Sequence, residues 1–155
     1  MILVTVGTQL PFERLIRAMD ALAPTLGTPI FAQTGRSPWV PVNMEWKAAL
    51  DPSEFDALMQ AASVVVSHAG TGTILLAQKL LKPIVIMPRL AALKEHRNDH
   101  QLATARQMKG RPGIEVAEAV GDLPDALQRA MTTFFSLVFH PERERLKAAI
   151  RRFIA

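Results

Sequence analysis

A short loop of glycines and hydroxyl side chains follows a β-branched run near the middle of the chain. It reads Ser-His-Ala-Gly-Thr-Gly-Thr over residues 67–73, between the apolar run 63–67 and a helical stretch from 74. Glycine lets a backbone approach a ligand closely, and the first N–H groups of a helix have no intrahelical partner. The loop is therefore a candidate phosphate cradle; its predicted contacts are Ser67, His68, Gly70, Thr71, Gly72 and Thr73.

The loop departs from two better-known phosphate motifs. It has neither the lysine of the P-loop nor the third glycine of G-x-G-x-x-G, which disfavours ATP hydrolysis and a dinucleotide cofactor. The alternative is a tight strand–helix turn that binds nothing. His68 favours a ligand, because an imidazole beside an anion cradle can donate to a phosphate, although it can also be read as a capping or core histidine.

Two more polar clusters follow apolar runs. Gly7, Thr8 and Gln9 come after the run 2–6, and a cluster from Arg89 to Gln101 comes after the run 84–87. The carboxyl ends of parallel strands meet at one sheet edge, where open α/β sheets bind ligands. We therefore expect all three clusters to face one crevice.

A metal centre is not predicted. The chain has no cysteine and no D-x-D motif. His96 and His100 are spaced i, i+4, which can bring two imidazoles together on a helix, but the H-E-x-x-H order and a third ligand are missing. We expect metal-independent chemistry without a cofactor.

Alternating strand and helix patterns position these clusters. Strands are predicted at 2–6, 29–33, 42–46, 63–67, 84–87 and 114–116. Helices are predicted at 11–22, 54–62 with Ser53 as N-cap, 74–81, 99–108, 122–138 and 141–154. The expected fold is α/β: a single domain over residues 1–155 with one Rossmann-like, doubly wound parallel sheet.

Composition narrows the functional class. With 155 residues, 49% hydrophobic and 21% charged, the chain is typical of one globular domain, and it has no apolar run long enough to cross a membrane and no basic leader. We expect a cytoplasmic protein. The net charge is −2 over residues 1–77 and +6 over 78–155, which indicates either an anionic partner or a solvated surface. Aromatics are 6%, with no tyrosine and no nucleic-acid-binding motif, so a nucleic acid partner is disfavoured.

Three segments carry a family resemblance: VVVSHAGTGTILLA with KPIVIMPR, EHRNDHQ, and the opening VTVGTQLPFERL. Over residues 1–110 they resemble the donor-binding half of GT-B glycosyltransferases, of the family 28 C-terminal type. The similarity is greatest to small subunits of two-component UDP-sugar transferases, either bacterial exopolysaccharide β-1,4-glucuronosyltransferases or eukaryotic dolichol-pathway N-acetylglucosaminyltransferases.

The resemblance implies roles for individual residues. The loop 67–73, with Gly7 and Thr8, would bind the donor diphosphate. Many members have an acidic residue for the ribose where this chain has Leu76, so ribose recognition must come from elsewhere or be weaker. The donor sugar would be held by Gln9, Asn98, His100, Gln101 and Arg89, and the uracil by Leu50, Asp51 and Pro52. For a glucuronate, Arg89 or Arg97 would pair with the carboxylate.

The implied function is that of the UDP-sugar-binding subunit of an inverting transferase. A membrane-anchored partner would carry the general base and the site for a lipid-linked acceptor, keeping this subunit at the inner face of the membrane. Residues 122–155 include an apolar stripe that either docks on this partner or packs on the chain's own sheet; a second copy of the chain is another candidate partner. One alternative is a regulatory or assembly subunit that binds no nucleotide, which Leu76 favours; another is a nucleic-acid-binding module.

Overall fold

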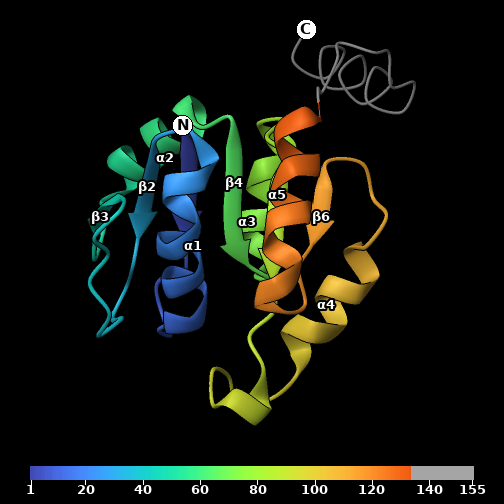
Figure 1. The fold of residues 1–155 in the computed structure, drawn as a ribbon. Coiled ribbons are helices and arrows are strands. Elements are labelled where there is room, and N and C mark those ends of the chain that lie inside the picture. Colours follow the sequence, from blue (N-terminus) through green and yellow to red (C-terminus); the bar gives the residue numbers. More distant parts are fainter. Residues whose placement is uncertain (134–155) are drawn as a thin grey trace, which may run out of the picture.

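The structure, a computed structural model, describes residues 1–133. In that part the chain forms one six-stranded parallel sheet with the order β3-β2-β1-β4-β5-β6 (Figure 1). The strand order reverses direction between β1 and β4, so the predicted doubly wound fold is confirmed. The strands are β1 (Ile2–Thr5), β2 (Ile30–Gln33), β3 (Glu45–Lys47), β4 (Val64–His68), β5 (Ile84–Met87) and β6 (Ile114–Val116).

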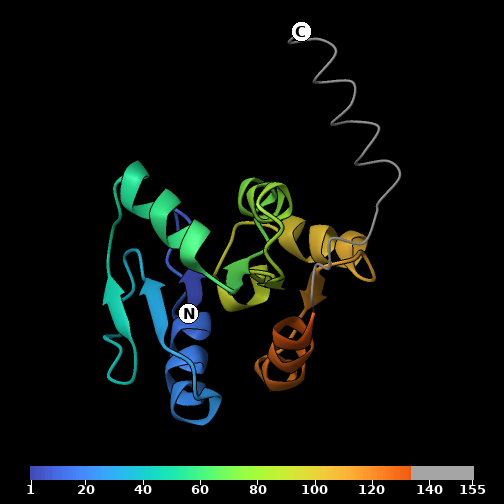
Figure 2. The same cartoon turned by 90° about the horizontal axis from the view of Figure 1, so that it is seen from above.

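Helices cover both faces of the sheet (Figure 2). On one face lie α1 (Glu13–Leu26) and α5 (Leu123–Thr132), and on the other lie α2 (Pro52–Ala61), α3 (Thr71–Lys79) and α4 (His100–Met108). Short 3₁₀ turns at Ala91–Leu93 and Val120–Asp122 precede α4 and α5. No helix in residues 1–133 is long and apolar enough to cross a membrane.

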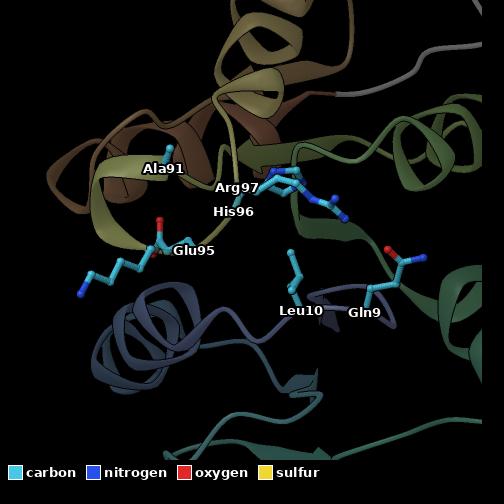
Figure 3. A pocket seen from close by; sticks show the side chains of 7 residues that line it. Gln9, Leu10, Ala91, Glu95, His96 and Arg97 are labelled. Atoms are coloured by element: carbon cyan, nitrogen blue, oxygen red, sulfur yellow. The ribbon is translucent and has the colours of Figure 1, made fainter.

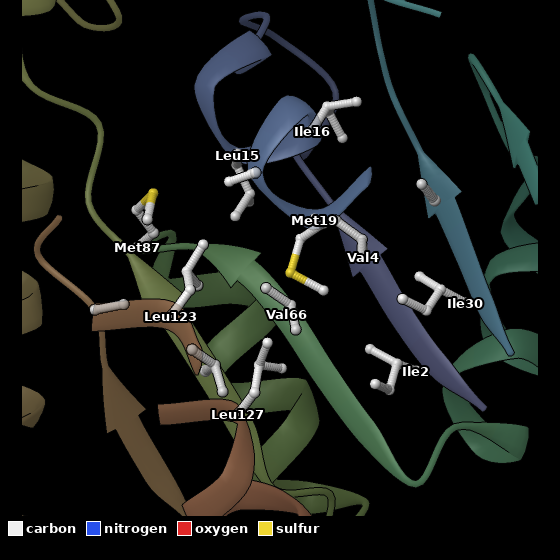
Figure 4. Close-up of a cluster of buried hydrophobic side chains, with 14 of the residues drawn as sticks. Ile2, Val4, Leu15, Ile16, Met19, Ile30, Val66, Met87, Leu123 and Leu127 are labelled. Atoms are coloured by element: carbon white, nitrogen blue, oxygen red, sulfur yellow. The ribbon is translucent and has the colours of Figure 1, made fainter. Parts of the chain in front are cut away.

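The two faces of the sheet bury separate apolar clusters. Successive strand side chains point to opposite faces, so Ile2 and Val4 pack against α1 and α5, whereas Leu3 packs against α2, α3 and α4. Figure 4 shows the first cluster, where Leu15 and Met19 of α1 approach the sheet beside α5. Because both faces are covered, the central strands read as continuous apolar runs.

The first helix continues beyond residue 22, where it was predicted to end, and includes a proline. Pro24 lies inside α1, which ends where Gly27 adopts a left-handed conformation, φ 62°. Proline donates no N–H, which leaves the carbonyl of Asp20 without its helical partner. The Asn43 side-chain amide donates to that carbonyl at 3.1 Å, so the missing bond is replaced from outside the helix.

Other predicted ends of helices and strands also differ from those in the structure. The predicted N-cap Ser53 lies within α2; the cap is Asp51, whose Oδ1 accepts from the Glu54 N–H at 2.8 Å in a capping box. The third strand begins at Glu45 rather than at residue 42. Helix α5 ends at Thr132, before the predicted residue 138, with Thr133 extended. The predicted last helix, 141–154, lies outside the described residues.

Candidate functional site

Three strand-end loops line one cavity where the strand order reverses. The cavity has a volume of about 850 Å³ and lies between the loops after β1, β4 and β5. The segments after β2 and around residues 48–52 close its other side. The predicted convergence of the polar clusters at one sheet edge is therefore what the structure shows. The predicted site residues that line it are Gly7, Thr8, Gln9, Leu50, Pro52, His68, Gly70, Thr71, Gly72, Thr73, Arg89 and Gln101.

The amino end of α3 opens into this cavity. The helix begins at Thr71 rather than at the predicted residue 74, so Gly70 is its N-cap and Thr71–Thr73 form its first turn. Gly70 provides no side chain to cap the helix. The free N–H groups of this turn and the partial positive charge of the helix end favour an anion.

The His68 imidazole is wedged between two glycines. A β-carbon on Gly70 would lie 2.2 Å from the imidazole Cε1, and one on Gly7 would lie 2.8 Å from its Nε2. Gly7 also has a φ of +76°, which favours glycine. Both residues must therefore be glycine for the ring to sit at the cavity wall.

Two donors contact the inner nitrogen of the same ring. Arg89 Nη1 lies 3.0 Å from His68 Nδ1, and Gln101 Nε2 lies 3.2 Å from it. Burial, followed by the charges of Arg89 and His96, lowers the pKa of His68 to about 4. His68 is therefore neutral at physiological pH.

Arg89 lies beneath the cavity with only 3% of its surface exposed. Its Nη2 donates to the carbonyls of Val6, at 2.6 Å, and Leu10, at 2.5 Å, and the guanidinium stacks over Phe12. Burial lowers the pKa of Arg89 to about 10, so the group keeps its charge at neutral pH. Arg89 thus ties the loop after β1 to His68, and its terminal nitrogens are already engaged by protein atoms.

The predicted sugar-binding residues separate into two groups. Gln101 is buried, and its Oε1 accepts from the N–H groups of Ala69 and Arg89 at 3.2 and 3.1 Å, which joins the ends of β4 and β5. His100, which is exposed, and Asn98, whose Oδ1 accepts from the His100 N–H at 3.0 Å, do not line the cavity. Neighbouring residues on a helix point about 100° apart, so His100 and Gln101 point in different directions here.

A second, smaller pocket of about 440 Å³ adjoins the first. It shares Gln9, Leu10 and His96 with the main cavity, and Lys94 and Arg97 add positive charge (Figure 3). Its one carboxylate, Glu95, is neutralised by a two-pronged ion pair with Arg14, at 2.9 Å for each contact. This pocket extends the cavity on the side of the loop after β5.

Two other predicted ligand positions, Asp51 and Ser67, do not line the cavity, and neither does Leu76. The Asp51 carboxylate caps α2 and does not line the cavity. Ser67 is fully buried, and its Oγ has no hydrogen-bond partner among the described residues. Strand alternation turns its side chain to the face of the sheet opposite to that of His68. Leu76 packs against the second apolar cluster. Leu50 and Pro52, the residues on either side of Asp51, do line the cavity.

Several lining residues were not predicted: Thr5, Gln33, Gly35, Arg36 and Phe55. Gln33 is the last residue of β2 and Arg36 follows it, so the strand-end rule that selected the other loops applies here too. Gln33 is buried and links β1 to residue 48, since its Nε2 donates to the carbonyls of Gly7 and Ala48 at 3.1 Å each.

The two histidines considered for a metal are not on one helix. His96 precedes α4, and His100 is its first residue. Within residues 1–133, no three His, Cys, Asp or Glu side chains gather in a way that would hold a metal ion.

Comparison with known structures identifies the same fold in glycosyltransferases. The solution structure of ALG13 aligns at TM-score 0.61 and 18% identity, covering 94% of this chain and 93% of that one. SsfS6 of Streptomyces sp. SF2575, crystallised with thymidine diphosphate, aligns at TM-score 0.59 and 22% identity, and SnogD from Streptomyces nogalater at 0.51 and 20%. The chain covers 37% and 34% of these two longer enzymes.

Sequence comparison assigns the family. A comparison with curated proteins gives no match. The glycosyltransferase family 28 C-terminal domain, in contrast, matches residues 1–136, which include all three cavity-lining loops. The chain therefore belongs to the glycosyltransferase family 28 C-terminal domain family, and its fold is that of a GT-B half domain.

Proposed function

We propose that the chain is the donor subunit of a UDP-sugar-dependent, inverting hexosyltransferase and works with a partner subunit. The observation that carries this proposal is the junction of the α3 amino end, the His68 imidazole and the loop after β1 in one cavity. These groups offer N–H donors and positive potential, but no carboxylate, to a bound diphosphate. SsfS6, a structural neighbour, was crystallised with thymidine diphosphate, a ligand with this same group.

The proposed reaction needs stabilisation of a departing diphosphate. An acceptor hydroxyl attacks the anomeric carbon, the bond from this carbon to the UDP oxygen breaks, and UDP leaves with the electron pair. Fixed donors already aimed at the developing charge lower the barrier without a metal ion. The first turn of α3 and His68 are such donors here, with the buried Arg89 charge below them. The acceptor proton passes to a general base on the partner.

The sugar would occupy the end of the cavity near Gln9 and the second pocket. Glucuronate and N-acetylglucosamine remain the two candidate sugars. Arg89 is a poor partner for a glucuronate carboxylate, because protein acceptors already engage both its terminal nitrogens. Arg97 is exposed in the second pocket and is the better-placed cation.

The partner in this proposal is a membrane-anchored glycosyltransferase subunit that binds a lipid-linked acceptor for polysaccharide synthesis. The support is that the chain corresponds to 93% of ALG13 but only about a third of SnogD and SsfS6. Binding to such a subunit would hold the chain at the cytoplasmic face of the membrane. Co-expression of both chains should give a complex that transfers sugar, whereas the isolated chain should bind the donor without transferring it.

The second candidate function is a non-catalytic assembly subunit that binds no nucleotide. Leu76 favours it, because this side chain packs into an apolar cluster and offers the ribose no hydrogen bond. The two candidates differ in whether the cavity binds a nucleotide.

Calorimetry with UDP, UDP-glucuronate, UDP-N-acetylglucosamine and thymidine diphosphate, each with a chelator present, tests the proposal. UDP compounds should bind saturably, and Thr73→Val should weaken binding about tenfold because a hydroxyl at the α3 amino end is lost. Thr132→Val is the matched control, since this threonine lies on α5 and donates to the Gln128 carbonyl at 3.0 Å. The absence of binding by every compound would favour the assembly subunit instead.

A further inference from the structure

The contacts of His68 Nδ1 determine which ring nitrogen carries the proton. An arginine guanidinium only donates hydrogen bonds, and Arg89 Nη1 lies 3.0 Å from Nδ1. Gln101 supplies a second donor: because its Oε1 accepts from two backbone N–H groups, the atom 3.2 Å from Nδ1 is its NH₂ nitrogen. With two donors against it, Nδ1 must be the acceptor, and in the neutral ring the proton is then on Nε2.

The other side of the ring faces the ligand space. Nε2 lies 2.8 Å from the position that a β-carbon of Gly7 would take and 2.9 Å from that of Gly70, whose nearest ring atom is Cε1 at 2.2 Å. Among the described residues no atom forms a hydrogen bond with Nε2, and His68 lines the main cavity. An N–H is therefore left free where the loops after β1 and β4 meet the amino end of α3.

Among the described residues, no carboxylate contacts the buried charge of Arg89. Its acceptors are the carbonyls of Val6 and Leu10 and the His68 ring, and its Nε has no partner among the described residues. A buried cation in this state is costly unless an anion offsets it. The other charged groups near the ring are His96, which lowers the pKa of His68, and Glu95, which acts on Arg89 but is paired with Arg14.

We propose that Arg89 is a positioning residue of the nucleotide-sugar site: together with Gln101 it holds His68 as the neutral tautomer with its proton on Nε2, which directs this N–H at a phosphate oxygen of the ligand. The part that concerns the ligand rests on the proposed function, whereas the tautomer does not. Because the ring stays neutral, the site binds its anion with a fixed N–H donor whose strength is constant across physiological pH. A role in packing alone would leave the tautomer unspecified.

Nitrogen NMR of the histidine ring in the ligand-free chain is the first test. The ¹⁵N shifts of His68 should show a protonated Nε2 and an unprotonated Nδ1 that do not change between pH 5.5 and 8. A proton on Nδ1, or titration near pH 6.5, would overturn the proposal. Because this measurement uses the unaltered chain and no nucleotide, it stands even if the proposed function fails.

Two arginine variants then connect the tautomer with binding. In Arg89→Met the Nδ1 lone pair loses its charged donor, so the Nδ1–H form should appear and the affinity for a UDP-sugar should fall at least tenfold. Arg89→Lys restores a charged donor, so it should recover part of the Nε2–H tautomer and part of the affinity. Arg106→Met is the control: it removes an exposed arginine of α4 that pairs with Glu118. This variant should change neither the tautomer of His68 nor the affinity for a UDP-sugar.

The outcomes distinguish failure of the positioning role of Arg89 from failure of the proposed function. Unchanged affinity in folded Arg89→Met would contradict the positioning role, even if the tautomer is the one stated. If Arg89→Met does not fold, Arg89→Lys and the spectrum of the unaltered chain still decide. If the tautomer is as stated but the unaltered chain binds no UDP-sugar, the proposed function fails, and the ligand part of this inference fails with it.

Discussion

At the scale of single residues, the His68 imidazole explains why small residues surround it. Gly70 and Gly72 are two positions apart in the same loop, but only Gly70 is in contact with the ring: a β-carbon on Gly72 would meet nothing within 4 Å. The two glycines therefore serve different purposes. Gly70 makes room for His68, and Gly72 leaves room for whatever binds at the α3 amino end.

Alanine at each glycine tests this difference. Gly70→Ala should destabilise the fold by about 1–3 kcal/mol, because the new β-carbon overlaps the held ring. Gly72→Ala should stabilise it by about 0.5–1 kcal/mol as a helical glycine replacement, yet weaken UDP binding. Urea unfolding and calorimetry measure the two effects. Equal stability changes in both variants would contradict this assignment.

The pH dependence of stability reports on His68. The pKa of His68 is about 4 in the folded chain, against 6.5 in the unfolded one, so between these pH values the unfolded state binds the additional proton. The free energy of unfolding should therefore fall by up to about 3 kcal/mol as the pH drops from 7 to 4.

His68→Gln isolates that contribution from the carboxylates. Glutamine does not titrate, so the curve of the variant should fall less steeply than that of the unaltered chain over the same range. Parallel curves in urea unfolding series would show that His68 has an ordinary pKa.

At the scale of elements, Asp20 fixes the segment that leads into β3. Its carboxylate is buried inside α1 and accepts from the N–H groups of Asn43, at 2.7 Å, and Val42, at 3.1 Å. Asp20→Ala should cost about 2–3 kcal/mol, because two partly buried N–H groups lose their acceptor. Asp125→Ala, at an exposed position on α5, is the control; a similar loss in both variants would contradict the role of Asp20.

The ion pair between Arg14 and Glu95 joins α1 to the loop after β5. Both side chains are mostly buried, and Arg14 also donates to the Pro88 carbonyl at 2.9 Å. Glu95→Ala should increase amide hydrogen exchange in residues 89–98 while leaving β5 protected, because the loop loses its main tether. Glu118→Ala breaks the exposed pair with Arg106 and should not affect that loop.

Element order was more predictable than element ends. Alternating apolar runs and helical spacing predicted all six strands and the first five helices, because burial of both sheet faces imposes these patterns. Their ends depend on individual contacts that periodicity does not encode. Asn43 lets α1 pass Pro24, and the Asp51–Glu54 capping box moves the α2 N-cap from Ser53.

The site was predictable to the same extent. The strand-end rule located the cavity and most of its lining, because parallel strands place their carboxyl ends together. The rule does not predict that the Arg89 side chain lies beneath the cavity, or that His100 is exposed to solvent while Gln101 is buried. Those orientations follow from side-chain contacts made only in the fold.

At the scale of the whole molecule, the sheet places an anion-binding cavity at its carboxyl edge and leaves the opposite edge free of it. The loops before the strands, which include Gly27 and Gly110, belong to that opposite edge. Gly27 and Gly110 are therefore glycine controls, within the same chain, for the glycines that line the cavity. We expect the nucleotide part of the donor to bind at the carboxyl edge.

Amide NMR of the ¹⁵N-labelled chain during titration with UDP locates the binding site. Saturable shifts are expected at Gly7, Gly70 and Gly72, and none at Gly27 or Gly110. An absence of shifts at saturating UDP, or shifts centred on Gly27 and Gly110, would contradict binding at the carboxyl edge.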